Sequence, residues 1–274
     1  MKAAALQMNT SRDRDRNLAT AARLVAEAAS AGADLVVLPE KWPWIARDEG
    51  IRDGAEELGG PAITAARSWA REFGIHLVAG SFTEDRGEGT LSNTSPAIGP
   101  DGEIIALYRK VHMFDAEVDG IEYRESAFEE PGDEVVVFPV GEALVGLAIC
   151  YDIRFPELFM ALAERGATVV CLPSAFTPKT GRDHWEVLVR ARAIENQCFV
   201  VAADQFGEAE PGFGFWGHSL IAGPWGRVVS GMEEGEGYVI ASLDFDELER
   251  VRRELPALEH RRPDLFPVAS GGVA

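Results

Sequence analysis

The chain has 274 residues, of which 46% are hydrophobic, and its 26 basic and 45 acidic residues give a formal net charge of −19. A chain of this length can bury one large core, its negative charge disfavours nucleic acid, and its strand-length apolar runs predict neither a membrane span nor a secretory signal. Three cysteines, Cys150, Cys171 and Cys198, form no even disulfide set and have no paired spacing for zinc, which favours a reducing cytoplasm.

The first half of the chain alternates strands with helices. Residues 2–8 predict an opening strand, and helical spacing after Asn17 as N-cap predicts a helix over 17–31. A buried strand over 34–40 follows and places Glu40 at its carboxyl end, where open α/β sheets usually carry their chemistry. A hairpin then presents Lys110 at its end. The other elements expected in this half are a helix over 61–73, a strand over 75–81 and the hairpin itself, over 95–108 with a turn at 100–102.

The second half starts with a segment, 114–132, that has little periodicity and many charges. We expect a long ordered loop there, a feature that is usually functional in a compact domain. A hairpin over 135–149 then delivers Cys150, and Pro156 opens a helix over 156–165 because its fixed φ suits a first turn. The remaining expected elements are a strand over 167–174, a helix over 183–196 capped by Asp183, strands over 198–203, 218–222, 227–230 and 237–243, and a helix over 244–255.

Two stretches of the chain, 32–40 and 166–174, repeat one pattern of Gly-Ala, a buried strand and Leu-Pro after a helix. This repetition predicts two similar halves related by a pseudo-two-fold axis. No linker or low-complexity tract divides the chain, so we predict a single domain over residues 1–274. Helices that alternate with strands and hairpins predict an α/β fold of mixed sheets covered by helices.

Cys150 stands where a buried strand gives way to a helix start. Unpaired backbone N–H groups at such a start carry partial positive charge, which favours the thiolate and nucleophilic attack. A free cysteine is more often a small buried hydrophobe. This stretch alone leaves both interpretations open.

Glu40, Lys110 and Cys150 each follow an apolar strand, so all three are expected at the rim of the core. A structural Glu40–Lys110 ion pair explains the pattern as well as a catalytic role does, because buried charges need partners. If the groups converge, Cys150 can attack a carbonyl carbon while Glu40 serves as general base. Lys110 and the backbone N–H of Tyr151 would then hold the oxyanion, and Glu125 would orient Lys110 or the intermediate.

Separated motifs occur in order along nearly the whole chain. They are Leu38-Pro-Glu40, Tyr108-Arg-Lys-Val-His112, Ile149-Cys-Tyr-Asp-Ile-Arg-Phe-Pro-Glu157, Leu172-Pro-Ser-Ala-Phe176 and Trp216-Gly-His-Ser219. Together they resemble the carbon–nitrogen hydrolase, or nitrilase, superfamily. The resemblance implies an α-β-β-α sandwich that dimerises into an α-β-β-α/α-β-β-α assembly and carries out amidase chemistry without a cofactor or a metal. It also implies a Glu–Lys–Cys triad of Glu40, Lys110 and Cys150, with Glu125 as an additional acidic residue.

The segments His184-Trp-Glu186, Arg190-Ala-Arg-Ala-Ile-Glu195 and His260-Arg-Arg-Pro-Asp264 most resemble the Nit branch, to which deaminated glutathione amidase and ω-amidase belong. The resemblance implies cleavage of a non-peptide C–N bond in a small linear amide through a cysteine thioester, with release of ammonia and a carboxylic acid. The segment 207–215 is acidic and aromatic, where deaminated glutathione amidase tends to carry basic residues.

Other functions are open alternatives to this interpretation. Hydrolysis of N-carbamoyl amino acids or of nitriles uses the same residues, and a catalytically silent interaction or sensor subunit would keep the fold. A histidine base, from His112, His184 or His218, is disfavoured by the complete motif set. Phe176 and Trp185 are candidates for lining the substrate pocket beside Tyr151, although core packing is as common for such side chains. We expect a small amide and water as reactants, and a homodimer or higher homo-oligomer without nucleic-acid or membrane partners.

Overall fold

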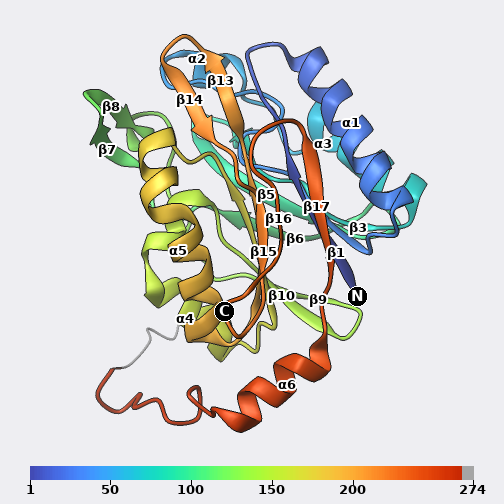
Figure 1. Ribbon diagram of the computed structural model, residues 1–274. Helices are drawn as coiled ribbons and strands as arrows, with labels where there is room; N and C mark the ends of the chain where they lie inside the picture. Colours follow the sequence, from blue (N-terminus) through green and yellow to red (C-terminus); the bar gives the residue numbers. More distant parts are fainter. Residues whose placement is uncertain (267–274) are drawn as a thin grey trace.

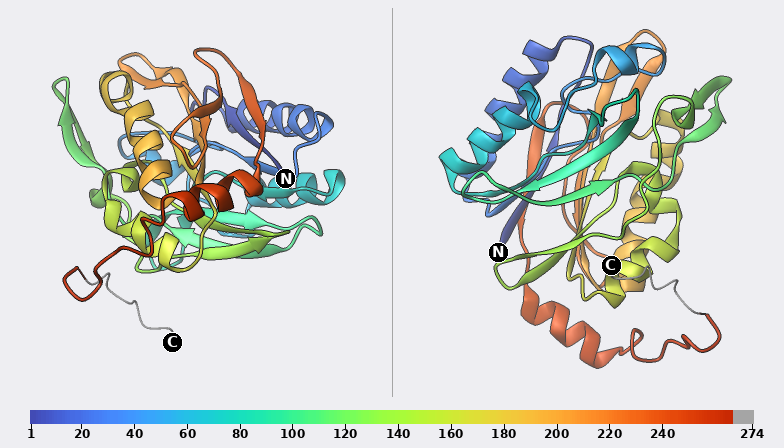
Figure 2. Two further views of the ribbon diagram at one scale, coloured as in Figure 1. Left: turned by 60° about the horizontal axis from the view of Figure 1, so that its bottom comes forward. Right: turned by 180° about the vertical axis from the view of Figure 1, so that it is seen from behind.

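The computed structural model describes residues 1–266, which form two stacked β-sheets between two layers of helices (Figure 1). Helices α1 (Arg14–Ser30) and α3 (Pro61–Phe73) cover one sheet, and α4 (Pro156–Glu164) and α5 (Pro178–Asn196) cover the other (Figure 2). The expected α/β fold, an α-β-β-α sandwich, is therefore confirmed. None of the helices in the described part of the chain is long and apolar enough to cross a membrane.

The first sheet has seven strands, in the order β17-β1-β2-β3-β5-β4 with β6 paired to β5. Strands β1, β2 and β3 run parallel, and the other pairs are antiparallel. The strands are β1 (Lys2–Gln7), β2 (Leu35–Val37), β3 (His76–Val78), β4 (Phe82–Asp85), β5 (Leu91–Ile98), β6 (Ile104–Arg109) and β17 (Gly237–Ser242).

The second sheet has six strands, in the order β16-β15-β12-β11-β10-β9. Its strands β10, β11 and β12 run parallel, as β1, β2 and β3 do in the first sheet. The strands are β9 (Val137–Val140), β10 (Ala143–Leu147), β11 (Val169–Ser174), β12 (Phe199–Asp204), β15 (Leu220–Ala222) and β16 (Val228–Gly231). The repeated stretches therefore supply equivalent strands, β2 and β11, each at the centre of three parallel strands. Their ends meet, because the backbone N–H of Glu40 donates to the carbonyl of Ser174 over 3.3 Å.

The hydrophobic core has two layers, and the alternation of side chains along β1 shows why. Ala3 and Ala5 face the second sheet, whereas Ala4 and Leu6 face α1 and α3. Both faces of the strand are thus buried, which explains its nearly continuous apolar sequence.

Two hairpins stand at one end of the sandwich (Figure 1). Strands β7 (Asp115–Val118) and β8 (Ile121–Arg124) form one, and β13 (Phe206–Glu210) and β14 (Phe213–Trp216) form the other. The prediction of a loop over 114–132 is wrong in this respect, because the segment contains the first hairpin and a 3-10 turn, Glu125–Ala127. The φ angles of Asp119 and Gly120, 52° and 76°, are both positive, as a type I′ hairpin turn requires.

Two helix starts differ from the prediction. Asp13, and not Asn17, caps α1 by accepting a hydrogen bond from the backbone N–H of Arg16. Helix α5 begins at Pro178, well before Asp183, because proline suits the first helical turn. The other helices are the short α2 (Gly50–Asp53) and α6 (Phe245–Glu254), whose N-cap is Asp244, the residue at which this helix was predicted to begin.

Candidate active site

The turn that carries Cys150 follows β10 directly. Its backbone is a 3-10 turn, Cys150–Arg154, and α4 begins only after it, at Pro156. The φ angle of Cys150 is 46°, a left-handed conformation that costs a non-glycine residue about 1–3 kcal/mol and is concentrated at functional sites. The side chain is only 8% exposed, and it lines a cavity of about 90 Å³.

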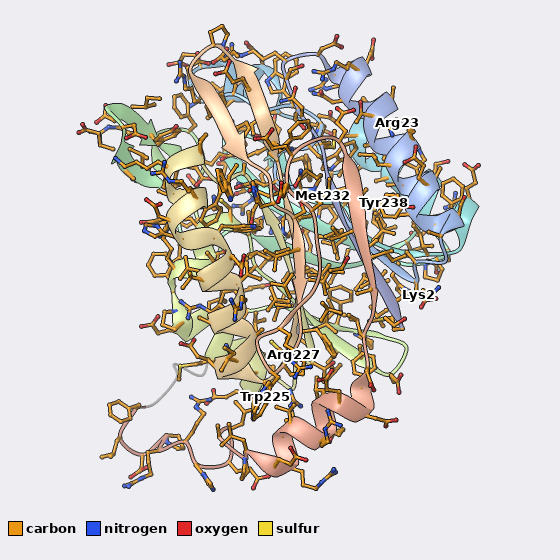
Figure 3. All side chains as sticks on the ribbon, in the orientation of Figure 1. Lys2, Arg23, Trp225, Arg227, Met232 and Tyr238 are labelled. Atoms are coloured by element: carbon orange, nitrogen blue, oxygen red, sulfur yellow. The ribbon has the colours of Figure 1, made fainter. Side chains whose placement is uncertain are left out.

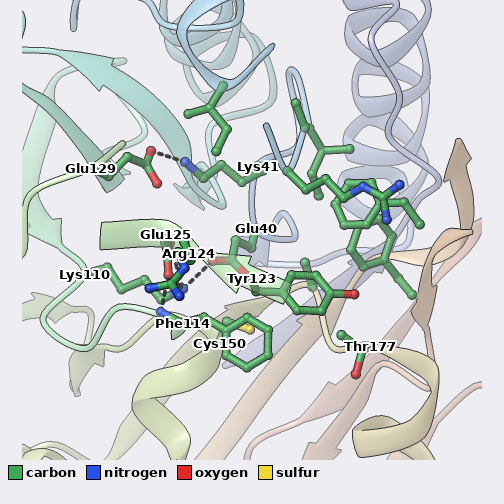
Figure 4. Close-up of a pocket in the computed structure, with 17 residues that line it drawn as sticks. Glu40, Lys41, Lys110, Phe114, Tyr123, Arg124, Glu125, Glu129, Cys150 and Thr177 are labelled. Atoms are coloured by element: carbon green, nitrogen blue, oxygen red, sulfur yellow. Dashed lines mark hydrogen bonds and ion pairs between the residues drawn. The ribbon is translucent and has the colours of Figure 1, made fainter. Parts of the chain in front are cut away.

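Glu40 and Lys110 reach the same cavity from the first sheet, at the ends of β2 and β6 (Figure 4). The Nζ atom of Lys110 lies 2.9 Å from Oε1 of Glu40, and the two residues are 2% and 4% exposed. Cys150 comes from the second sheet. The structure therefore brings together the three residues that the sequence placed at strand ends.

Glu125 completes a network around the lysine. Its carboxylate accepts hydrogen bonds from Lys110 Nζ over 2.8 and 3.0 Å and from the backbone N–H of Phe114 over 2.7 Å. Asn93, on β5, donates from Nδ2 to Oε1 of Glu40 over 2.8 Å and to Oε1 of Glu125 over 2.9 Å. One buried amide thus holds both carboxylates beside the ammonium. Sequence reasoning missed Asn93, because it is one of four consecutive polar residues, 92–95, and the sequence does not show which of them meets the two carboxylates.

Charge pairing decides the protonation of the lysine and of Glu125. Burial alone would lower the pKa of Lys110 and raise that of Glu125. The attraction of Glu125 and Glu40 outweighs burial and holds the pKa of Lys110 well above its ordinary value. Lys110, and next Lys41, similarly hold the pKa of Glu125 below its ordinary value. An ammonium and a carboxylate therefore face each other at neutral pH.

Cys150 keeps its proton. Burial, and next the charge of Glu40, raise the pKa of the thiol well above its ordinary value, although Lys110 and the backbone N–H of Ala175 oppose the shift. The thiolate expected from a helix start is thus not the resting form. A neutral thiol needs a base within reach, and Glu40 lines the same cavity as the thiol.

A second buried ion pair lies beside the first. Lys41 Nζ pairs with Glu129 and donates to Thr83 Oγ1 over 2.7 Å. Burial raises the pKa of Glu129, while Lys41 opposes that rise. Lys41 and Glu129 line the same cavity as the triad, so carboxylates and ammonium groups alternate along one wall (Figure 4).

Apolar and aromatic side chains also line the cavity, and three of them, Tyr123, Phe213 and Phe215, come from the two hairpins. The apolar and aromatic side chains there are Ile45, Ile51, Phe114, Tyr123, Phe213 and Phe215. Arg47 lies among them, with its guanidinium 5.4 Å from the ring centre of Phe213 and 3.7 Å from Glu210. The charged segment that was expected to be functional therefore does contribute to the site, through β8.

The predicted substrate-binding residues lie on the other side of Cys150. Tyr151 and Phe176 line a small cavity of about 20 Å³ that Cys150 also borders. Trp185 is buried behind Phe176, with ring centres 4.8 Å apart, and its Nε1 donates to the carbonyl of His218. The structure thus places Tyr151 and Phe176 beside the thiol and Trp185 one layer further into the core.

The three histidines that we weighed as alternative bases lie away from the nucleophile. His112 bonds to Asp152, His184 to Arg154, and His218 to the carbonyl of Trp216. None of the three is among the residues that line the larger cavity. The arrangement therefore favours Glu40 over a histidine as the base.

Comparison with known proteins agrees with this geometry. The family model described as carbon-nitrogen hydrolase matches residues 2–253. The chain is 43% identical to deaminated glutathione amidase of Homo sapiens, over 96% of this chain and 83% of that protein. It is 38% identical to omega-amidase NIT2 of Danio rerio, over 97% and 96%. A solved structure of the amidase from Nesterenkonia sp. AN1, a glutamate-to-glutamine mutant with acrylamide added at the active site cysteine, matches with a TM-score of 0.83 and 28% identity, over 97% and 98%.

Proposed function

Because the chain belongs to the carbon–nitrogen hydrolase family and is a hydrolase of non-peptide C–N bonds, we propose that Glu40, Lys110 and Cys150 are its catalytic triad. The observation that carries this proposal is their convergence. A thiol from one sheet and a paired carboxylate and ammonium from the other line one buried cavity. Such an arrangement holds charged groups in a site that largely excludes water, where they can stabilise a developing oxyanion.

The first half of the proposed reaction forms a thioester. The sulfur of Cys150 attacks the amide carbon, and Glu40 accepts the thiol proton as the S–C bond forms. Lys110 and the backbone N–H of Tyr151 stabilise the oxyanion of the tetrahedral intermediate. Glu40 then gives the proton to the nitrogen, the C–N bond breaks, and ammonia leaves.

The second half hydrolyses the thioester. Glu40 takes a proton from water while the oxygen attacks the thioester carbon. The S–C bond breaks, the sulfur regains its proton from Glu40, and the carboxylic acid leaves. Glu125 transfers no proton in this scheme; it holds Lys110 in place with Asn93.

The substrate class follows from the relatives and from the size of the cavity. Both named relatives are amidases, and the cavity of about 90 Å³ suits a short, linear acyl group. We therefore expect a small amide of the kind that deaminated glutathione amidase or an ω-amidase uses. The β13–β14 hairpin lines part of this cavity with the apolar rings of Phe213 and Phe215. Arg47, which lies beside Phe213, already has an acidic neighbour in Glu210 of the same hairpin.

The test is a substrate panel of deaminated glutathione, other small ω-amides, N-carbamoyl amino acids and the nitriles that match the amides. We expect ammonia from amides, with no carbon dioxide, and faster turnover of amides than of nitriles. Cys150→Ala should abolish ammonia release, whereas the control Cys198→Ala, in the buried β12 region, should retain it. Turnover by Cys150→Ala at the wild-type rate would contradict the proposal, and carbon dioxide release would favour the carbamoylase alternative.

We also propose a homodimer, formed through the outer face of α5. Val187 and Ile194 on that helix are 68% and 49% exposed, and Trp225, labelled beside the end of α5 in Figure 3, is 52% exposed. Large apolar side chains gathered on one face are typical of an interface. Val187→Glu should shift the mass measured by light scattering from dimer to monomer, and a monomeric wild type would contradict this assignment.

The cytoplasm is the location that we propose. All three cysteines are unpaired and buried, and unpaired thiols are typical of a reducing compartment. Fractionation of the native cells should recover the protein with cytoplasmic markers, and recovery elsewhere would contradict the proposal.

A further inference from the structure

We propose that Asp152 is a positioning residue for the triad: its buried carboxylate ties the turn of Cys150 to the segment that carries Lys110. Asp152 does not line the cavity that holds the triad, so it acts through its neighbours. The inference rests on the proposed function, since it assigns Asp152 a task in that reaction. Its basis is a set of hydrogen bonds that joins the two sheets.

The carboxylate of Asp152 is fully buried and accepts four hydrogen bonds. Oδ1 accepts from the backbone N–H of His112 over 3.1 Å and lies 2.7 Å from its Nδ1. Oδ2 accepts from the hydroxyl of Tyr108 over 2.7 Å and from the backbone N–H of Ile149 over 2.8 Å. Two oxygens thus serve four donors, which is the full capacity expected of a buried carboxylate.

These donors flank two members of the triad. Tyr108 and His112 lie two residues before and two residues after Lys110, and Ile149 directly precedes Cys150. Tyr108 lies on β6 of the first sheet, His112 lies just after that strand, and Ile149 follows β10 of the second sheet. Asp152 is therefore a short, rigid link between the chain positions of the ammonium and of the thiol.

The surroundings hold the link in place. The ring of His112 stacks on Phe155 with centres 3.7 Å apart, and the backbone N–H of Phe155 donates to the carbonyl of Asp152 over 3.0 Å. Burial, and next the charge of Asp152, raise the pKa of Tyr108 well above its ordinary value, so the phenol stays a donor.

The link also closes the strained turn. The backbone N–H of Asp152 donates to the carbonyl of Ile149 over 3.0 Å, while its side chain accepts from the N–H of the same residue. Cys150 lies between them with its φ of 46°. A strained conformation persists only where neighbouring contacts impose it. Asp152 supplies such contacts on both sides of the nucleophile.

An amide in place of the carboxylate breaks this arrangement while it keeps the volume. Asp152→Asn turns one oxygen into an NH₂ group, which would face either the N–H of Ile149 or the donors of His112. One buried N–H then loses its acceptor, and the turn shifts relative to Lys110. A displacement of about 1 Å at a reacting group can cost about 100-fold in rate.

The experiment compares Asp152→Asn with Tyr108→Phe, which removes one of the four bonds, and with Leu248→Ala, a core truncation in α6. Steady-state kinetics on the best amide of the panel and the rate of Cys150 alkylation by iodoacetamide are measured below every unfolding midpoint. We expect Asp152→Asn to lower kcat about 100-fold with KM within twofold of wild type, and Tyr108→Phe to lower it about tenfold. Leu248→Ala should be destabilised and keep wild-type kcat.

The inference is overturned if a folded Asp152→Asn keeps kcat within twofold of wild type, or if kcat falls in Leu248→Ala as it does in the Asp152 variant. If Asp152→Asn does not fold, Tyr108→Phe decides in the same way. If the wild type hydrolyses no amide, the proposed function fails by itself. The rate of alkylation then tests the positioning role of Asp152 by itself. A slower reaction at Cys150 in Asp152→Asn supports this role, and an unchanged rate overturns it.

Discussion

Lys110→Met tests the electrostatics of the site most severely. The substitution keeps most of the unbranched side chain and removes the ammonium that both carboxylates contact, at 2.9 Å from Glu40 and 2.8 Å from Glu125. The two carboxylates then share only the amide of Asn93. Removal of one partner from a buried ion pair costs about 3–5 kcal/mol, because an uncompensated charge stays behind. We expect the free energy of unfolding at pH 7 to fall by about that amount.

The variant should also reverse the pH dependence of stability. In the wild type, the pKa of Glu125 is lowered, so this group contributes stability above its ordinary pKa of 4.5 that is lost as the pH falls through the folded value. In the variant, two facing carboxylates raise one folded pKa above 4.5. The group with the raised pKa then contributes stability below pH 4.5 and loses it as the pH rises through the folded pKa. The free energy of unfolding of the variant should therefore increase from pH 7 to pH 5, by up to about 1.4 kcal/mol per pH unit.

Urea unfolding at both pH values measures these changes. The double variant Lys110→Met/Glu125→Gln is the control, since it removes one carboxylate and should regain most of the loss at pH 7. A loss under about 1 kcal/mol in Lys110→Met, or the same pH dependence as in the wild type, would refute the reasoning.

Three further predictions concern single side chains. Asn93→Ala should cost about 3 kcal/mol or more in urea unfolding, because it removes two hydrogen bonds to carboxylates worth about 1.5–3 kcal/mol each, and a loss under about 1 kcal/mol would count against its placement. Glu40→Gln should fold and lose about 10²–10⁴-fold in kcat, as expected for loss of a general base; near-normal kcat would reassign the base. Burial raises the pKa of the Cys198 thiol from 9.0 to about 12. This group therefore contributes fully to the free energy of unfolding below pH 9, and the contribution is lost as the pH rises toward 12. Unfolding of Cys198→Ala should therefore depend less steeply on pH in that range, by up to about 1.4 kcal/mol per unit, and equal slopes would contradict the assignment.

The convergence of Glu40, Lys110 and Cys150 could be predicted because each directly follows an apolar strand. The end of an apolar strand can be located from the hydrophobic pattern of the sequence, and the motifs around the three residues all resemble the same family. The layers of the fold followed for the same reason, as buried strands alternate with amphipathic helices. The repeated stretches 32–40 and 166–174 supply β2 and β11, each the middle one of three parallel strands.

What the sequence did not reveal depends on contacts between distant segments. Asn93 stands in a run of polar residues, 92–95, and Asp152 in the turn after Cys150, and only the packing of one sheet on the other shows which donors and acceptors they meet. The β7–β8 hairpin was missed because each of its strands has only four residues, although both alternate charged and apolar residues and Asp119-Gly120 is a strong turn signal. The expectation of a thiolate at Cys150 was wrong because burial and the charge of Glu40, which raise the pKa of the thiol, outweigh Lys110 and the backbone N–H of Ala175, which lower it.

The most direct test of the proposed reaction is the mass of the intact protein, quenched during turnover of a good amide substrate. The account predicts an added mass equal to the amide minus ammonia, located on the peptide that contains Cys150 and absent from Cys150→Ala. Hydrolysis that proceeds without any such adduct, and at the same rate in Cys150→Ala, would contradict it.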